Sequence, residues 1–178
     1  MKSSKKLAVT GLLSALICVA APFSFPVGVI PVSLATFAIY IVAAFYDYRA
    51  GVIAVLIYIA LGACGVPVFS GFKGGAQVLA GATGGYIVGY VFLALIEGII
   101  IDNFENKKFV YPLAMILGTA VLYAFGTVWF IIIMKTSFVG ALTVCVVPFL
   151  AGDALKIAAA TAVSLPLRSA VKKVAVKA

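Results

Sequence analysis

Histidine is absent from this sequence, and aspartate and glutamate together number only five among 178 residues. The chain therefore lacks both a histidine general base and a histidine metal ligand. Its three cysteines, Cys18, Cys64 and Cys145, lie far apart and form no Cys-x-x-Cys pair. We expect them to be small packing residues, and we predict no metal site and no cofactor. The Gly-x-x-x-x-Gly-Lys-Ser/Thr loop is also absent, so ATP energy would have to come from another subunit.

Charged residues of both signs are scarce. They make up 10% of the chain, against about 25% in soluble domains. Hydrophobic residues make up 65%, and the mean hydropathy is +1.27. Residues 27–46, 50–72, 74–96 and 109–134 are long apolar runs, and a membrane-spanning helix needs roughly 20 such residues. The composition predicts an all-α integral membrane protein, organised as a single transmembrane substrate-binding domain over residues 1–178.

Polar and proline-containing breaks divide the chain into six predicted transmembrane helices. Pro22, Pro26 and Pro31 separate the first two spans, and Asp47-Tyr48-Arg49 forms a short polar turn. Residues 102–108 form the most hydrophilic loop. We place the spans at 7–22, 32–47, 51–67, 83–101, 110–134 and 141–166.

The basic residues predict the orientation, because Lys and Arg gather in cytoplasmic loops. With six spans, both termini lie on one side, which we predict to be the cytoplasm. The opposite side carries only Lys73 and Lys135. The net charge of +8 then reflects topology and contact with anionic membrane lipids, not nucleic acid. The residues on the predicted cytoplasmic side are Lys2, Lys5, Lys6, Arg49, Lys107, Lys108, Arg168, Lys172, Lys173 and Lys177.

The first span carries small residues spaced four apart, as Thr10, Ser14 and Cys18 and as Gly11 and Ala15. This spacing aligns them on a helix face that another helix can approach closely. Packing within the protein and docking of a partner subunit both explain such a face. Basic residues before this apolar stretch also resemble a signal peptide, so removal of the segment is an alternative.

Glycine is concentrated between the third and fourth spans, where residues 74–86 read GGAQVLAGATGGY. Irregular backbone at membrane depth is tolerated where protein buries it or where it lines a cavity. A flexible connector with close helix packing is one interpretation. The other is a glycine-rich loop that covers a ligand, with Lys73, Gln77, Thr83 and Tyr86 as its polar or amphipathic members.

Asp153 and Lys156 lie within the otherwise apolar run 144–163. A charge near the centre of a bilayer costs on the order of 3 kcal/mol, and intramembrane ionisable residues usually mark function. The two residues are three positions apart, so they share a helix face and can offset each other. A self-neutralising pair without a ligand is the simpler interpretation. The alternative is a binding site in which Asp153 accepts from N–H groups and Lys156 donates to a carbonyl.

The ligand that suits such a pair is a small, partly apolar molecule with an amide-like head. Lys73 could meet an anionic tail. Aromatic residues near the outer side are candidate walls, namely Phe23, Phe25, Phe69, Tyr86 and Phe149.

Four motifs resemble those of the BioY family, the biotin-binding S-components of energy-coupling factor (ECF) transporters. They are Pro31-Val32-Ser33-Leu34, Gly65-Val66-Pro67-Val68-Phe69-Ser70-Gly71, Gly81-Ala82-Thr83-Gly84-Gly85-Tyr86 and Gly152-Asp153-Ala154-Leu155-Lys156. The resemblance covers nearly the whole chain. Family members usually have proline where this chain has Ala82, and that difference removes a φ constraint.

The resemblance implies an S-component fold of six helices and a role in biotin uptake at a bacterial or archaeal plasma membrane. It implies that Asp153 and Lys156 contact the ureido head and that the glycine loop closes over it. The partners it implies are a membrane coupling subunit and two cytoplasmic ATPases, docking on Gly11, Ser14, Ala15 and Cys18. The further biotin-binding candidates are Gln77, Thr83, Gly84, Gly85, Tyr86, Lys73 and Phe69.

Three functions remain open at this point. The first is a biotin-capturing transport subunit. The second is an uptake protein for another small vitamin, or one that works without partner subunits. The third is an intramembrane enzyme that uses Asp153 as acid or base. No second carboxylate is placed convincingly beside Asp153, since Glu97 lies near the cytoplasmic end of its span. A purely structural role does not explain the buried pair.

Overall fold

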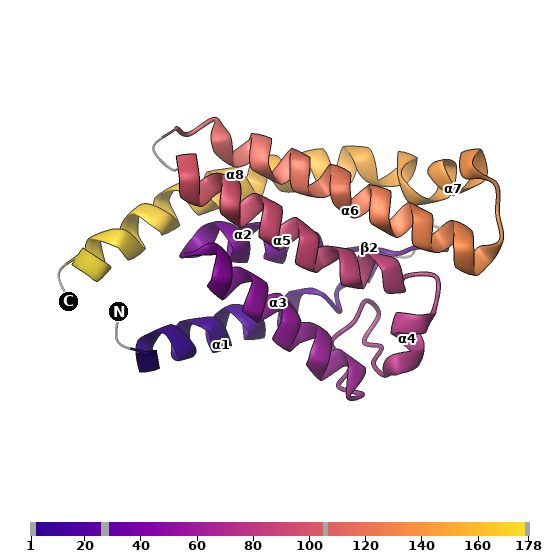
Figure 1. The fold of residues 1–178 in the computed structure, drawn as a ribbon, viewed down its shortest axis with the longest axis horizontal. Helices are drawn as coiled ribbons and strands as arrows, with labels where there is room; N and C mark the ends of the chain where they lie inside the picture. The colour runs from indigo at the N-terminus through magenta and orange to yellow at the C-terminus, as the bar shows by residue number, and fades with distance from the viewer. Residues whose placement is uncertain (1–2, 26–28, 105–106, 177–178) are drawn as a thin grey trace.

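The computed structural model describes residues 3–25, 29–104 and 107–176, which form a helical bundle (Figure 1). Two residue pairs, Ser24–Ser33 and Phe25–Val32, form a small antiparallel sheet. The elements are α1 (Ser3–Ala20), β1 (Ser24–Phe25), β2 (Val32–Ser33), α2 (Ala35–Phe45), α3 (Tyr48–Ala63), α4 (Ala76–Ala80), α5 (Gly84–Phe104), α6 (Val110–Met134), α7 (Phe138–Cys145) and α8 (Val147–Val176).

The short helix α2 lies at the centre of the bundle. It packs against α8, α5, α3 and α1, while α5 and α6 form the most extensive helix pair. Ile39, Tyr40 and Val42 of α2 are fully buried in the main hydrophobic core. The first turns of α1 and the last turns of α8 lie at the same end of the bundle, and α4 and α7 lie at the other (Figure 1).

Three helical segments of the described chain are long and apolar enough to cross a membrane: Gly84–Phe104, Val110–Met134 and Phe138–Val171. The predicted fourth and fifth spans, 83–101 and 110–134, coincide closely with α5 and α6. The apolar helices α2 and α3 are shorter, with 11 and 16 residues. The described residues therefore form an all-helical fold apart from the two-residue strands, with at least three segments suited to a bilayer.

The predicted boundaries of the second and third spans were wrong. Residues 32–33 form a strand instead of helix, and α2 ends at Phe45. Helix α3 already begins at Tyr48, because the Asp47 carboxylate caps it by accepting from the Ala50 N–H at 2.7 Å. It ends at Ala63, since Gly65 has a φ of +102°, a conformation that glycine adopts readily.

The predicted sixth span, 141–166, is not one uninterrupted helix. The helix is interrupted at Val146, between α7 and α8. Pro148 is the second residue of α8, in its first turn, where a proline lacks only an N–H that has no intrahelical partner. Helix α8 then continues to Val176 and contains Pro166. The break places the start of α8, and with it Asp153, beside the central helices.

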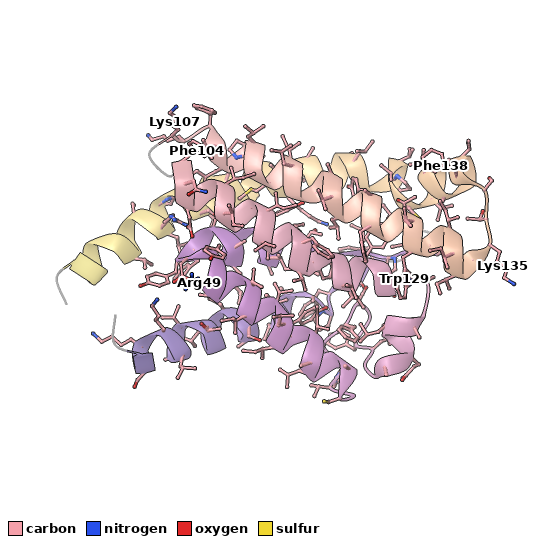
Figure 2. All side chains as sticks on the ribbon, in the orientation of Figure 1. Arg49, Phe104, Lys107, Trp129, Lys135 and Phe138 are labelled. Carbon is pink, nitrogen blue, oxygen red and sulfur yellow. The ribbon has the colours of Figure 1, made fainter. Side chains whose placement is uncertain are left out.

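Arg168, which the sequence assigns to the predicted cytoplasmic side, is buried, with 4% of its surface exposed. Its guanidinium contacts Asp102 and the Ala44 carbonyl. Arg49 and Lys107 lie at the end of the bundle that carries both terminal helices, and Lys135 lies at the other (Figure 2). Lys2 and Lys177, and the side chains of Lys172 and Lys173, lie outside what the structure describes.

The four predicted docking residues of α1 do not share one exposed face. Gly11 and Ala15 are exposed, whereas Ser14 is buried and Cys18 is half-buried. The reason is geometric: the two stripes of four-residue spacing lie on neighbouring faces of the helix. The stripe that contains Ser14 faces the bundle, and the stripe that contains Gly11 faces outward.

Candidate functional site

A cavity with about 810 Å³ of empty space, including its open mouth, lies among the central helices. Its walls come from residues 29–36, from residues 69–83 between α3 and α5, and from α3, α5, α6 and α8. The segments that line it are far apart in the sequence, so the cavity exists only in the folded bundle.

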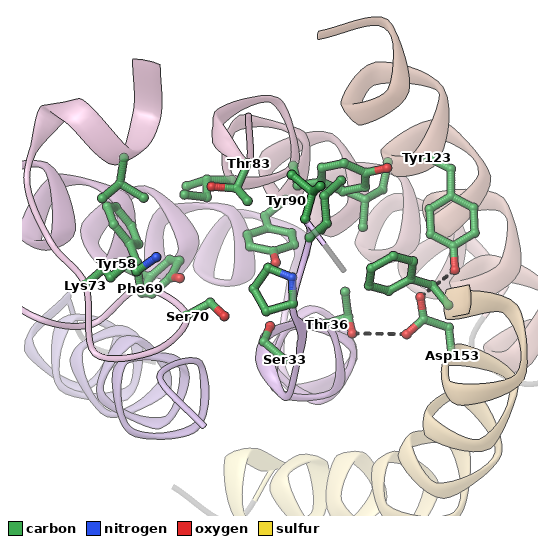
Figure 3. A pocket seen from close by; sticks show the side chains of 18 of the residues that line it. Ser33, Thr36, Tyr58, Phe69, Ser70, Lys73, Thr83, Tyr90, Tyr123 and Asp153 are labelled. Carbon is green, nitrogen blue, oxygen red and sulfur yellow. Dashed lines mark hydrogen bonds between the residues drawn. The ribbon is translucent and has the colours of Figure 1, made fainter. Parts of the chain in front are cut away.

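Asp153 lies at one side of this cavity and is almost completely buried, with 4% exposed. Its Oδ2 accepts a hydrogen bond of 2.6 Å from the Tyr123 hydroxyl of α6. Its Oδ1 accepts from Lys156 Nζ at 2.9 Å and lies 3.5 Å from Thr36 Oγ1 of α2 (Figure 3). The carboxylate is therefore held by residues from three helices.

Lys156 completes this cluster. Its ammonium forms an ion pair with Asp153 and donates to Thr36 Oγ1 at 3.1 Å. The side chain is 12% exposed and lines the cavity. Burying two charges is costly unless they are paired and hydrogen-bonded, and both conditions are met. The pair predicted from the sequence is present, and it presents both a carboxylate and an ammonium to the cavity.

A second polar group lies across the cavity. Lys73 is on the side of Phe69 and Tyr58, away from Asp153 and Tyr123 (Figure 3). A turn positions Lys73, because the Phe69 N–H donates to the Lys73 carbonyl at 2.9 Å and the Lys73 N–H donates back at 3.3 Å. Phe72 within this turn has a φ of +57°, which is uncommon for a bulky residue. The cavity therefore has a cation at the end remote from the Asp153–Lys156 pair.

Aromatic side chains form the wall between these two ends. The rings of Tyr58 and Phe69 are T-shaped, with centroids 5.5 Å apart. A Cβ at Gly62 would lie 2.1 Å from Phe69 Cζ, so glycine at that position is what allows the ring to lie inward. Tyr86 donates its hydroxyl to the Cys145 carbonyl at 2.9 Å, and Tyr90 also lines the wall. Such a surface suits an apolar ring or chain.

Of the predicted binding residues, six line the cavity: Phe69, Lys73, Thr83, Tyr86, Asp153 and Lys156. Three do not. Gln77 is turned back on its own segment, where Nε2 donates to the Gly74 carbonyl at 2.8 Å. Gly84 and Gly85 are packing positions, because an added Cβ would meet Leu79 O at 1.7 Å and Trp129 Cβ at 2.2 Å respectively.

Of the aromatic residues predicted to form the cavity wall, some line the cavity and others are exposed. Phe149 lines the cavity with Phe69 and Tyr86. Phe23 and Phe25 are exposed instead, at 53% and 71%, and Phe23 packs edge-on against Phe72. The glycine-rich segment is also more ordered than a plain loop, because residues 76–80 form the short helix α4.

Sequence reasoning missed the hydroxyl groups that surround the pair. Thr36 and Tyr123 bond to it directly, and Ser33, Ser70 and Tyr90 also line the cavity. Uncharged hydroxyls within apolar runs give no strong signal, because they also occur at ordinary helix contacts. The position of Thr36, just after the Pro31-Val32-Ser33-Leu34 motif, was the one available indication.

The fold and the cavity together define a helical protein with segments suited to a membrane and a cavity between its helices. The comparisons then specify the family, since the BioY family model matches residues 1–173. The chain belongs to the BioY family.

Curated relatives support this assignment. A biotin transporter BioY of Thermotoga maritima is 36% identical, over 92% of this chain and 96% of its own length. A probable biotin transporter BioY of Pyrococcus horikoshii is 33% identical, over 93% and 96% respectively. A crystal structure of the S-component for biotin from an ECF-type ABC transporter superposes with a TM-score of 0.87, covering 95% of each chain at 23% identity. That similarity shows a shared fold.

Proposed function

We propose that this protein captures biotin at a plasma membrane as the S-component of an ECF-type transporter. The observation that carries the proposal is the buried Asp153–Lys156 pair at one side of an aromatic cavity. The ureido head of biotin has two N–H donors and one carbonyl acceptor. A carboxylate accepts from N–H groups and an ammonium donates to a carbonyl, so the pair complements that head.

The remainder of the cavity suits the rest of the same ligand. Lys73, at the other side of the cavity (Figure 3), complements the carboxylate at the end of the biotin tail. The wall that contains Phe69, Tyr86 and Tyr90 suits the thioether ring and methylene chain. Residues 64–83, with Thr83 at the cavity, form the cover. In this proposal Gln77, Gly84 and Gly85 support that cover instead of touching biotin.

The transporter context supplies the proposed partners and topology. The exposed stripe with Gly11 and Ala15 is the docking surface for a membrane coupling subunit that works with two cytoplasmic ATPases. The chain crosses the membrane six times, with α1, the segment 32–47 that contains β2 and α2, α3, α5 and α6 as spans and α7 with α8 as the sixth. The clustering of Arg49 and Lys107 at the end with both terminal helices (Figure 2) supports cytoplasmic termini.

Uptake of labelled biotin tests this proposal. Cells that lack their own biotin uptake should accumulate biotin when they express the chain with a coupling subunit and ATPases, and excess unlabelled biotin should compete. Chromatography of the cell extract should recover biotin unchanged. Conversion of biotin to a product would favour an enzyme that uses Asp153. Accumulation of another vitamin, with no accumulation of biotin, would keep the class and change the ligand.

A further inference from the structure

The Asp153–Lys156 pair is held from outside the helix that carries it. Both residues belong to α8, whereas Tyr123 belongs to α6 and Thr36 to α2. Tyr123 donates to Asp153 Oδ2 at 2.6 Å, and Thr36 accepts from Lys156 Nζ at 3.1 Å. A free lysine side chain has many rotamers, and ordering it costs entropy. The bonds from α2 and α6 order the pair before a ligand arrives.

The hydrogen bonds of this cluster also determine what remains for a ligand. A carboxylate offers about four acceptor positions and an ammonium three donors. Among the described residues, Lys156 and Thr36 contact Oδ1, Tyr123 contacts Oδ2, and two donors of Nζ go to Asp153 and Thr36. By this count, one acceptor position on Oδ2 and one N–H of Lys156 are available. A neighbouring acceptor and donor match a ligand that carries N–H and C=O on adjacent atoms, as a cyclic urea does.

We propose that Tyr123 and Thr36 are positioning residues that fix the Asp153–Lys156 pair for recognition of a cyclic urea. This inference rests on the proposed function for the identity of the natural ligand. Tyr123 acts by occupying one side of Asp153 Oδ2, so that the remaining position faces the cavity. Thr36 acts by bridging the ammonium and the carboxylate. Both act on the same pair, so removing one makes the other less effective.

A double-mutant cycle tests this role. The purified full-length protein is titrated with biotin by calorimetry as the parent, Tyr123→Phe, Thr36→Val and the double variant. We expect each single change to weaken binding about three- to tenfold. We expect the double variant to bind within about 1.5-fold of the weaker single variant, because residues that act on one network are not additive. Thr36→Ser keeps the hydroxyl and should bind within twofold of the parent.

Tyr40→Phe is the matched control. Tyr40 is a fully buried tyrosine whose hydroxyl bonds to Thr119 Oγ1 at 2.5 Å, and neither residue lines the cavity. Its hydroxyl bonds to Thr119 and makes no hydrogen bond to Asp153 or Lys156 that the structure shows, and the variant should bind biotin within twofold of the parent. The inference is overturned if the two test changes are fully additive, if Thr36→Ser binds as weakly as Thr36→Val, or if Tyr123→Phe is as harmless as Tyr40→Phe.

A second probe separates this inference from the proposed function. The same variants are titrated with 2-imidazolidinone, a cyclic urea without the thioether ring and the tail. If the parent binds this probe but not biotin, biotin is the wrong ligand, and weaker binding in Tyr123→Phe and Thr36→Val still supports the positioning role. If the parent binds neither compound, both proposals are overturned.

Discussion

Arg168 of α8 pairs with Asp102 of α5 at 2.5 Å, and its second guanidinium nitrogen donates to the Ala44 carbonyl of α2 at 3.0 Å. The other oxygen of Asp102 accepts from the Tyr48 N–H at the start of α3 at 2.8 Å. Two side chains thus satisfy backbone groups on both sides of the turn between α2 and α3. They tie together the four helices α2, α3, α5 and α8.

Replacing Arg168 should therefore destabilise the fold. We expect Arg168→Leu to lower the free energy of unfolding by about 3 kcal/mol, because Asp102 and a helix carbonyl lose a charged partner. Chemical denaturation in mixed micelles measures this change. Lys6→Leu is the control, since Lys6 lies 3.6 Å from Asp47 and is 54% exposed. Exposed pairs contribute little, so equal effects of the two changes would contradict the account.

Replacing Glu97 should instead raise the free energy of unfolding. This residue is fully buried in α5, and neither carboxyl oxygen has a hydrogen-bond partner among the described residues. Leaving a buried acceptor without a partner costs about 1–3 kcal/mol. We expect Glu97→Met, which keeps much of the volume, to raise the free energy of unfolding by that amount. A loss of stability in the same denaturation experiment would show that Glu97 has a stabilising partner in the membrane.

The docking surface on α1 predicts a variant that separates transport from binding. Ala15 is exposed on α1, and Ala120 is exposed on α6. Ala15→Leu should keep biotin affinity in detergent within twofold, because Ala15 does not line the cavity. In cells it should reduce biotin uptake at least fivefold, since the larger leucine side chain prevents a partner helix from approaching α1 closely. Ala120→Leu adds the same bulk elsewhere and should leave uptake unchanged. Equal uptake in both variants would place the docking surface elsewhere.

Ala82 predicts a stabilising change. Its preceding residue, Gly81, has extended backbone with a ψ of −174°, which a following proline favours. Among the described residues, the Ala82 N–H makes no backbone hydrogen bond outside the helices. We expect Ala82→Pro to stabilise the protein by about 0.4–1 kcal/mol, because proline restricts the unfolded chain. Thermal unfolding measures this gain, and a lower midpoint would show that residue 82 needs a φ that proline cannot adopt.

The sequence was most informative where its chemistry was unusual. Two charges within an apolar run are rare and costly, so Asp153 and Lys156 were recognisable without any structure. The long apolar runs likewise predicted α5 and α6 with small errors. The bounds of helix α2 were harder to predict. Because the residues around it are also apolar, the sequence does not show where strand β2 begins or that the Asp47 cap starts α3.

The less accurate parts depend on contacts between distant segments. Tyr123 and Thr36 are unremarkable in the sequence and gain a role only because α6 and α2 meet α8. Gly84 and Gly85 were predicted as binding residues, but the structure has them in contact with Leu79 and Trp129. Glycine marks close approach of some group, and sequence alone does not say whether that group is a ligand or a side chain.

Calorimetric titration of the purified protein with biotin tests the central claim, that the buried Asp153–Lys156 pair binds the ligand head. The parent is measured beside Asp153→Asn, Lys156→Met and Thr161→Val. Thr161 is the control, a polar residue of α8 that bonds to Met115 and does not line the cavity. The account predicts tight binding by the parent and by Thr161→Val, and at least a tenfold loss, about 1.4 kcal/mol, in the two pair variants. Undiminished binding in folded Asp153→Asn and Lys156→Met would contradict it.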